Sequence, residues 1–525
     1  PDVVVMLDDG CDADALGAAL ARLHGDAAGP DRAALATRAR TWMAARHAPA
    51  QAGPRMRDAI EAIAAASPAS HYAGLQQALR RLQQHLPAPA GALMETAAAI
   101  VANRLPAAPR QLLVDISALV QADLKTGIQR VVRSVLLGLI EAPPPGMRVE
   151  PVYSDGNGRP YRYARTATFR LLGLVLPARD PAPEADATAQ DDPFDPLEDA
   201  PVDARAGDLF LGLDLFTTGT EQNHAVLQAM RRRGVQVHFV VYDLLPVMRP
   251  DLFPVGASTY FAAYLDTVAA VSDGLACISR AVADELHHWL AARPPRRTTP
   301  LPLGYFHLGA DLGASAPSTG LPAHADQVLA AVAARPTVLM VGTLEPRKGH
   351  AQALAAFDLL WRQGTDVNLV VVGKLGWMVD AVAQQLRTHA ERDRRLFWLA
   401  GASDEMLDRL YGASSALLAA SVGEGFGLPL VEAARHGLPI IARDLAVFRE
   451  VGGDHAHYFT GADAAALAAS VQQWLALHAD GRAPPSTALP WLTWQDSVAQ
   501  LLHVLAGRRW HRTVAAPQPA AGAKP

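Results

Sequence analysis

The sequence is poor in the residues that mark several classes of protein. Only two cysteines, Cys11 and Cys277, occur among 525 residues, so we expect no disulfide framework, and a reducing compartment fits this usage. Lys and Arg number 47 against 52 Asp and Glu, a net charge of −5, and no basic run is interleaved with aromatics as in a nucleic-acid groove. No apolar stretch of about 18 residues lacks charge, so no membrane-spanning helix is predicted. These absences favour a cytoplasmic protein that does not bind nucleic acid.

Two further absences bear on the chemistry and on the ends of the chain. His, Cys and carboxylate side chains do not gather at the spacing of a metal site, so we predict no bound metal and no cofactor. The chain begins PDVVVMLDDG, without Met and without the basic segment of a signal peptide. We therefore expect that the native polypeptide continues upstream.

The composition is that of a large folded protein. Half of the residues are hydrophobic, enough for about three or four domains with cores. Residues 1–48 resemble the end of the folded region further along the chain, because DADALGAALARLHGD from Asp12 matches DAAALAASVQQWLAL from Asp463, so we interpret them as the possible remnant of an upstream domain of the same kind. The alternative is a chance similarity between two Ala-rich helices. Residues 49–109 are rich in Ala, Leu and Gln at helical spacing, and we interpret them as a helical linker.

Two series of alternating strands and helices follow. Residues 110–305 begin with the buried strand LLVDIS and read as one doubly wound domain, with an acidic, Pro-rich exposed insertion at 180–206. Residues 306–490 read as a second Rossmann-like domain. A closing helix is expected at 491–510 and a disordered tail at 511–525.

A basic pair stands at the start of a helix in the second series. The strand TVLMVG runs through TLEPRKGH into the helix AQALAAFDLLWRQ, which places Arg347 and Lys348 just before the helix N-terminus. Unpaired backbone N–H groups and the helix dipole already favour an anion there. The pair predicts a diphosphate site, although Arg-Lys at a helix start also occurs as an ordinary solvated pair.

Two glutamates follow in the segment SVGEGFGLPLVEAARHG. Glu424 lies between Gly423 and Gly425, and Glu432 stands on the helix that follows Gly427. Glycine lets the backbone approach a ligand closely. We expect Glu424 to bind sugar hydroxyls and Glu432 to bind the ribose diol.

Together these segments resemble family 4 of the retaining glycosyltransferases, over roughly residues 110–508. The resemblance implies an α/β protein of the GT-B type, with two Rossmann-like domains facing across a cleft behind a helical N-terminal segment. It implies that Arg347, Lys348 and Glu424 are the catalytic residues, with Arg347 and Lys348 on the donor pyrophosphate. The implied donor-binding residues are Gly127, Gly342, Thr343, Lys374, Gly425, Phe426, Gly427, Leu428 and Glu432.

The first series supplies the acceptor side by the same resemblance. The segments LLVDISALVQADLKTGIQR and VVYDLLP fall where the family lines its cleft, and Tyr242 stands where many relatives have His, so a His contact to the sugar is not carried over. A glycine before a helix is also a common turn. The implied acceptor-side residues are Thr126, Arg130, Asp243, Ser279, Arg280 and Asp311.

The implied function is transfer of a hexose from a nucleotide-diphosphate sugar to a bacterial surface polysaccharide such as O-antigen or capsule, with retention at the anomeric carbon and without a metal. Mannose from GDP-mannose is the favoured donor, because the TGIQR and YDLLP segments look most like mannosyl- and rhamnosyltransferases. Expected partners are the nucleotide sugar, a glycan or lipid-linked glycan acceptor and an upstream transferase domain; a lipid-linked acceptor would bring the enzyme to the inner face of the cell membrane. A non-catalytic GT-B binding module of a larger synthase and a nucleotide-sugar 2-epimerase are the alternatives.

Overall fold

The computed structural model describes residues 34, 36–41, 109–124, 126–172, 199–295, 297–311, 319–322, 324–507 and 509–516. Residues 1–108 and 109–525 are separate compact units. In the first unit, residues 36–41 are helical. The remainder of the upstream segment and the helical linker lies outside the described residues. The fold below is therefore that of residues 109–516.

The first of two sheets has eight strands in the order β14-β7-β6-β5-β4-β1-β2-β3. All neighbouring strands are parallel except β2 with β3 and β14 with β7. The strands are β1 Arg110–Asp115, β2 Met147–Tyr153, β3 Arg162–Tyr163, β4 Leu209–Gly212, β5 Gln236–Val241, β6 Gly274–Cys277, β7 Leu301–Tyr305 and β14 Trp510–Val514. Runs such as LFLG in β4 are apolar throughout because a parallel sheet is covered on both faces.

The helices of this sheet connect its strands. They are α6 Ser117–Gln121, α7 Gly127–Glu141, α8 Arg165–Leu171, α9 Thr217–Gln222, α10 His224–Arg232, α11 Leu245–Met248, the 3₁₀ turn η2 Pro250–Leu252, α12 Ala257–Val271, α13 Arg280–Ala292 and α21 Trp494–Leu505. The last of these begins with a capping box between Thr493 and Asp496.

The second sheet has six parallel strands in the order β10-β9-β8-β11-β12-β13. They are β8 Thr337–Val341, β9 Asn368–Val372, β10 Leu396–Leu399, β11 Ala416–Ala419, β12 Ile440–Arg443 and β13 His457–Phe459. The helices are α14 Ala325–Ala333, the 3₁₀ turn η4 Pro346–Lys348, α15 His350–Arg362, α16 Asp380–Thr388, α17 Asp404–Ala413, α18 Leu428–Arg435, α19 Ala446–Gly452 and α20 Ala464–Ala479.

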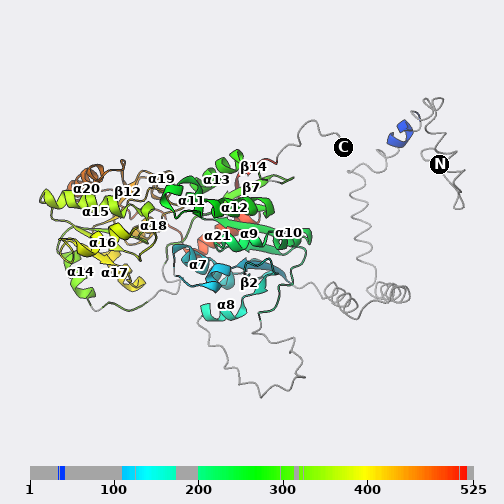
Figure 1. The fold of residues 1–525 in the computed structure, drawn as a ribbon, viewed down its shortest axis with the longest axis horizontal. Coiled ribbons are helices and arrows are strands. Elements are labelled where there is room, and N and C mark those ends of the chain that lie inside the picture. Colours follow the sequence, from blue (N-terminus) through cyan, green and yellow to red (C-terminus); the bar gives the residue numbers. More distant parts are fainter. Residues whose placement is uncertain are drawn as a thin grey trace, which may run out of the picture. The chain divides into compact units, whose positions relative to one another are not determined.

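Each sheet with its helices forms a lobe. We call residues 109–311 with 494–514 the first lobe, and residues 324–489 the second lobe. One buried apolar cluster belongs to each lobe, and a third contains residues of both, among them Phe306 of the first lobe and Phe426 and Phe448 of the second. Figure 1 shows α13 of the first lobe beside α19 of the second, and these helices contact each other.

Two sequence expectations were wrong at their boundaries. Residues 511–514 are not tail but part of β14, which pairs antiparallel with β7; the Pro- and Ala-rich residues that follow hid this short strand. Residues 199–206, placed in the exposed insertion, contact the edge of the first sheet, where Pro201 bridges Arg162 and Ala204 is buried. The rest of the insertion, 180–198, lies outside the described residues.

Candidate active site

The strand order of the second sheet reverses between β8 and β11. From β8 the chain adds β9 and β10 on one side, and then β11, β12 and β13 on the other. In open parallel sheets, ligands bind beyond the carboxyl ends of the strands at such a reversal, because the two following loops diverge there. The loops after β8 and β11 carry the sequences TLEPRKG and SVGEGFG.

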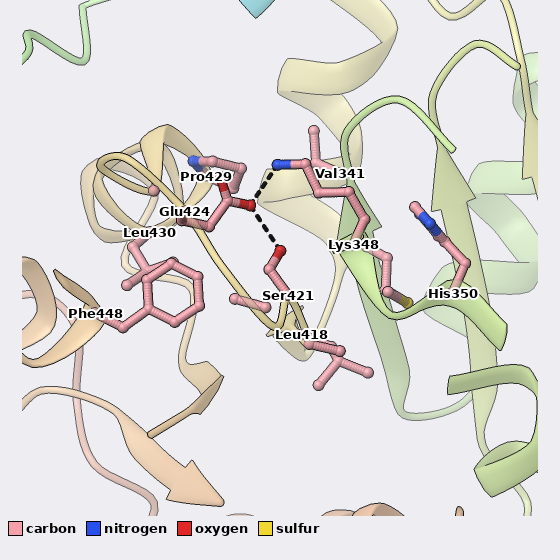
Figure 2. Close-up of a pocket in the computed structure, with 13 residues that line it drawn as sticks. Val341, Lys348, His350, Leu418, Ser421, Glu424, Pro429, Leu430 and Phe448 are labelled. Carbon is pink, nitrogen blue, oxygen red and sulfur yellow. Dashed lines mark hydrogen bonds and ion pairs between the residues drawn. The ribbon is translucent and has the colours of Figure 1, made fainter. Parts of the chain in front are cut away.

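These loops bring three predicted catalytic side chains together. Lys348 Nζ lies 2.5 Å from Glu424 Oε1, and Arg347 Nη1 lies 2.8 Å from Glu424 Oε2. Figure 2 shows Lys348 and Ser421 converging on Glu424 from two sides, and the Ser421 hydroxyl donates to Glu424 Oε1 at 2.6 Å. Arg347 Nε also lies 2.7 Å from Glu345 Oε2. Ser421 and Glu345 stand in the two motif loops but are not among the site residues predicted from the sequence.

The cluster is buried and charged. Burial raises the pKa of Glu424, but Lys348 and Arg347 outweigh burial and lower the pKa to about 2. Burial lowers the pKa of Arg347, but Glu424 and Glu345 reverse this and leave it above its ordinary value. Burial lowers the pKa of Lys348, and Glu424 offsets only part of that effect. Glu424 is therefore a carboxylate held between two cationic side chains.

Glycines shape the loops of the cluster. Gly427 has φ +100° at the start of α18, and Gly349 has φ +77° at the start of α15, backbone conformations that favour glycine. A Cβ on Gly349 would lie 2.5 Å from the Ala420 carbonyl oxygen, so the two loops approach each other backbone to backbone. Gly342 has φ +140°, and a Cβ added to it would lie 3.4 Å from Lys348 Cε.

A pocket adjoins the cluster. Figure 2 shows Phe448 and His350 at opposite ends of it in that view. Burial, with a further contribution from Lys348, lowers the pKa of His350 to about 4, so its ring is neutral near pH 7. The lining residues are Met340, Val341, Lys348, His350, Leu418, Ala419, Ala420, Ser421, Glu424, Gly427, Pro429, Leu430 and Phe448.

The other predicted donor-binding residues lie around these loops. Phe426 is buried, with its ring 5.6 Å from that of His307. Leu428 is the first residue of α18, and Thr343 follows Gly342 on the loop after β8. Lys374 is exposed, and its carbonyl oxygen accepts from the Leu344 amide at 2.8 Å. Gly127 opens α7, and a Cβ there would meet nothing within 4 Å.

Glu432 lies apart from the ion-pair cluster. Its Oε1 is 2.7 Å from Arg130 Nη1 of the first lobe, and its Oε2 accepts from the Tyr411 hydroxyl at 2.6 Å. Thr126 caps α7 by accepting from the Gln129 amide at 3.2 Å, which sets the helical turn that carries Arg130. Tyr411 is not predicted from the sequence, because nothing in its local pattern distinguishes it from a core tyrosine.

Asp243 and Ser279 belong to the first lobe and lie close to the loops of the second lobe. Burial raises the pKa of Asp243, and the nearby Arg347 opposes this. Asp243 accepts from the Leu245 amide at 3.0 Å. The Ser279 hydroxyl caps α13 and donates to the Gly425 carbonyl oxygen at 2.7 Å.

Arg280 and Asp311 do not bring their side-chain charges into the cluster. The Arg280 side chain is exposed, and its backbone amide donates to Glu450 Oε1 at 2.7 Å. Asp311 Oδ1 accepts from the Trp494 amide at 2.6 Å, where it anchors the start of α21. Within the described residues there is no group of three or more His, Cys, Asp or Glu side chains arranged for a metal.

Comparison with known proteins identifies the second lobe. Residues 325–483 match the family model described as glycosyl transferases group 1. This stretch is a group 1 glycosyltransferase domain. It contains the whole Arg347–Lys348–Glu424 cluster, together with Glu432.

Curated relatives extend beyond the group 1 domain. Over 406 residues, 77% of this chain and 46% of the relative, the chain is 43% identical to the serotype-specific mannosyltransferase WbdA of Escherichia coli. It is 34% identical over 138 residues to the O-antigen chain mannosyltransferase B of Escherichia coli, covering 26% of this chain and 36% of the relative. The chain thus spans about half the length of the WbdA proteins it matches.

Solved structures place the group 1 domain within a GT-B fold. Anabaena HepE in complex with UDP-glucose has a TM-score of 0.51 at 15% identity, covering 76% of this chain and 99% of that protein. Sucrose-phosphate synthase of Thermosynechococcus elongatus has a TM-score of 0.51 at 18% identity, covering 76% and 98%. Both lobes are included in these matches, and the predicted GT-B fold is confirmed. No helix in the described ranges combines the length and apolar character needed to cross a membrane.

Proposed function

We propose that this chain is a retaining glycosyltransferase that transfers mannose from GDP-mannose to a growing bacterial surface polysaccharide. The observation that carries the proposal is the pairing of Glu424 with Lys348 and Arg347 where the strand order of the second sheet reverses. The group 1 domain supports sugar transfer. The choice of mannose and of a surface polysaccharide follows from the relatives, which are named as mannosyltransferases of serotype and O-antigen.

In the proposed reaction, Lys348 and Arg347 bind the diphosphate. The bond between the sugar C1 and the phosphate oxygen breaks, and its electron pair leaves with the diphosphate. An acceptor hydroxyl oxygen attacks C1 from the same face, and its proton passes to the departing phosphate oxygen. The anomeric configuration is therefore retained, and no enzyme nucleophile is required.

Two cationic side chains and the start of α15 can neutralise the developing charge of the leaving group. Such preorganised charge is worth more in a buried site than in water. We propose that this replaces a metal ion, and that Glu424 aligns the sugar by accepting from its hydroxyls. Asp243 and the start of α7 would receive the acceptor.

Incubation of the full chain with GDP-[¹⁴C]mannose and a short mannose oligosaccharide, with and without EDTA, tests the proposal. We expect label in a longer oligosaccharide, an α-linkage by NMR, and the same rate in EDTA. A β-linked product would contradict retention, and loss of the rate in EDTA would contradict metal independence. If the chain binds GDP-mannose without forming product under these conditions, the binding-module alternative is favoured instead.

A further inference from the structure

Both oxygens of Glu432 are already occupied in the structure. Tyr411 donates its hydroxyl to Oε2 at 2.6 Å, and Arg130 Nη1 lies 2.7 Å from Oε1. The Glu432 side chain is only 3% exposed. If Glu432 accepts from the ribose diol, as the sequence predicts, one of these two partners has to move, because they and the surrounding residues leave the carboxylate almost no exposed surface.

The first partner, Tyr411, is fixed within the second lobe. It lies on α17 and is buried, and its ring stacks on that of His436 at a centroid distance of 5.3 Å and an interplanar angle of 11°. Glu432 and His436 belong to α18 and its C-cap in the same lobe. Tyr411 therefore cannot withdraw without disturbing the core.

The second partner, Arg130, comes from α7 of the first lobe and has fewer hydrogen bonds than Arg347. Its side chain is 21% exposed. It makes a single hydrogen bond to Glu432, and its Nε is buried without a hydrogen-bond partner among the described residues. By contrast, Arg347 has hydrogen bonds to Glu345, Glu424 and the Gly423 carbonyl oxygen. Arg347 is thus fixed by three partners, whereas the one hydrogen bond to Glu432 is the contact that Arg130 would have to give up.

The charges around Arg130 explain why it rests there. Burial lowers its pKa, but Glu432, Tyr411 and Asp404 raise it, and the net pKa is above the ordinary value. A buried carboxylate with no counter-charge is strongly unfavourable. Arg130 supplies the positive charge that Glu432 needs while no nucleotide is bound.

We propose that Arg130 occupies the place of the ribose diol until a nucleotide displaces it, and that Tyr411 is the positioning residue that keeps Glu432 directed at that place. This inference rests on the proposed function, because it takes the bound donor to be a nucleotide sugar whose ribose reaches Glu432.

Calorimetric titration of the full chain tests the inference. GDP and UDP are each compared with their 2′,3′-dideoxy analogues, which lack the two ribose hydroxyls that would donate hydrogen bonds to Glu432. In Arg130→Met we expect the ribonucleotide that the wild type prefers to bind about tenfold more tightly, the scale of one hydrogen bond to a charged group. Its dideoxy analogue should change by less than about twofold, because it gains no bond to Glu432.

Tyr411→Phe should act in the opposite direction. Loss of the hydroxyl leaves Glu432 Oε2 without its donor, so the ribonucleotide should bind about tenfold more weakly while the dideoxy analogue is unchanged. Arg133→Met is the matched control: Arg133 is also on α7 and pairs with Asp123 of its own lobe. It should leave both affinities unchanged.

Several results would overturn the inference. Weaker ribonucleotide binding in Arg130→Met would mean that Arg130 contacts the nucleotide. An equal change for the ribonucleotide and its dideoxy analogue would mean that the ribose is not involved. If Arg130→Met does not fold, Arg130→Gln is held to the same expectation. If the wild type binds none of these nucleotides, the proposed function itself fails, an outcome distinct from binding that ignores Arg130.

Discussion

The two sheets reverse their strand order in the same way, but the two reversal points hold different chemistry. In the second sheet the reversal between β8 and β11 carries Arg347, Lys348 and Glu424. In the first sheet the reversal lies between β1 and β4, and it carries the carboxyl groups of Asp115 and Asp214. The reversal in the second sheet therefore holds both cationic and acidic side chains, whereas the reversal in the first sheet holds two acidic side chains.

In the first lobe the carboxyl groups bind the protein itself. Asp115 Oδ1 accepts from the Ser117 amide at 2.9 Å, and Asp214 Oδ2 accepts from the Leu119 amide at 2.7 Å. The short helix α6 is thereby held over the reversal point. Burial raises the pKa of Asp115 to about 7, although hydrogen bonds from Ser117 oppose this. At this reversal point the two carboxyl groups thus bind backbone amides of the loop and helix beside them.

The largest effect is expected for Glu424→Gln. The amide keeps the shape of the side chain but has no negative charge to balance the positive charges of Lys348 and Arg347. We therefore expect kcat to fall about 10²- to 10³-fold. Steady-state transfer from GDP-mannose measures this. Glu405→Gln, at an exposed ion pair with Arg409 of the same lobe, is the control and should keep the wild-type rate. A loss of less than about threefold in Glu424→Gln would remove the distinction between the two reversal points.

Gly425→Ala tests the junction of the lobes and should rank second. The added Cβ would lie 2.0 Å from the Tyr242 carbonyl oxygen of the first lobe, so the backbone has to move. A shift of about 1 Å at a reacting centre costs about 10² in rate, while circular dichroism should show an intact fold. Gly412→Ala, where a Cβ would meet nothing within 4 Å, should leave the rate unchanged. Equal rates in both variants would mean that this contact does not position the site.

Glu450→Gln removes a charge that joins the lobes. The Glu450 carboxylate accepts from the Arg280 and Ala281 amides at the start of α13 and lies 2.7 Å from His307 Nε2. Burial raises its pKa, but these groups outweigh burial and leave it lowered. The variant should be about 2 kcal/mol less stable in urea unfolding near pH 7. Because the pKa is lowered in the folded state, this stability should disappear as the pH falls through the folded value, and an unchanged difference at low pH would contradict the account.

Asp115→Asn should have the smallest effect and the opposite pH dependence. The pKa of Asp115 is raised in the folded state from 3.8 to about 7, so the folded protein binds more protons and wild-type stability should fall as the pH rises between these values. The variant should cost about 1 kcal/mol at pH 5, less at pH 8, and about twofold or less in kcat. Urea unfolding at both pH values measures this. A large loss of kcat would mean that Asp115 takes part in the reaction, which would contradict a purely structural role for the first sheet's reversal point.

Much of the fold and the central cluster could be predicted from the sequence. Alternating apolar strands and helices specify two parallel sheets, and Arg347, Lys348 and Glu424 stand in loops that the strand order brings together. Contacts between the lobes could not be predicted. Arg130 and Glu432 are 302 residues apart, and their meeting depends on how two complete lobes dock. Strand β14 was missed because a five-residue edge strand has little periodicity, and its partner β7 lies about two hundred residues earlier.

The central claim is that the second lobe binds a nucleotide diphosphate through Lys348. Thermal unfolding of the wild type and Lys348→Ala with GDP, UDP, dTDP, CDP and ADP tests it most directly. A nucleotide at 100 times its dissociation constant should add about 2.7 kcal/mol of stability. The account predicts that one nucleotide, GDP first, raises the midpoint of the wild type and not that of Lys348→Ala. Equal shifts in both proteins, or no shift with any nucleotide, would contradict it.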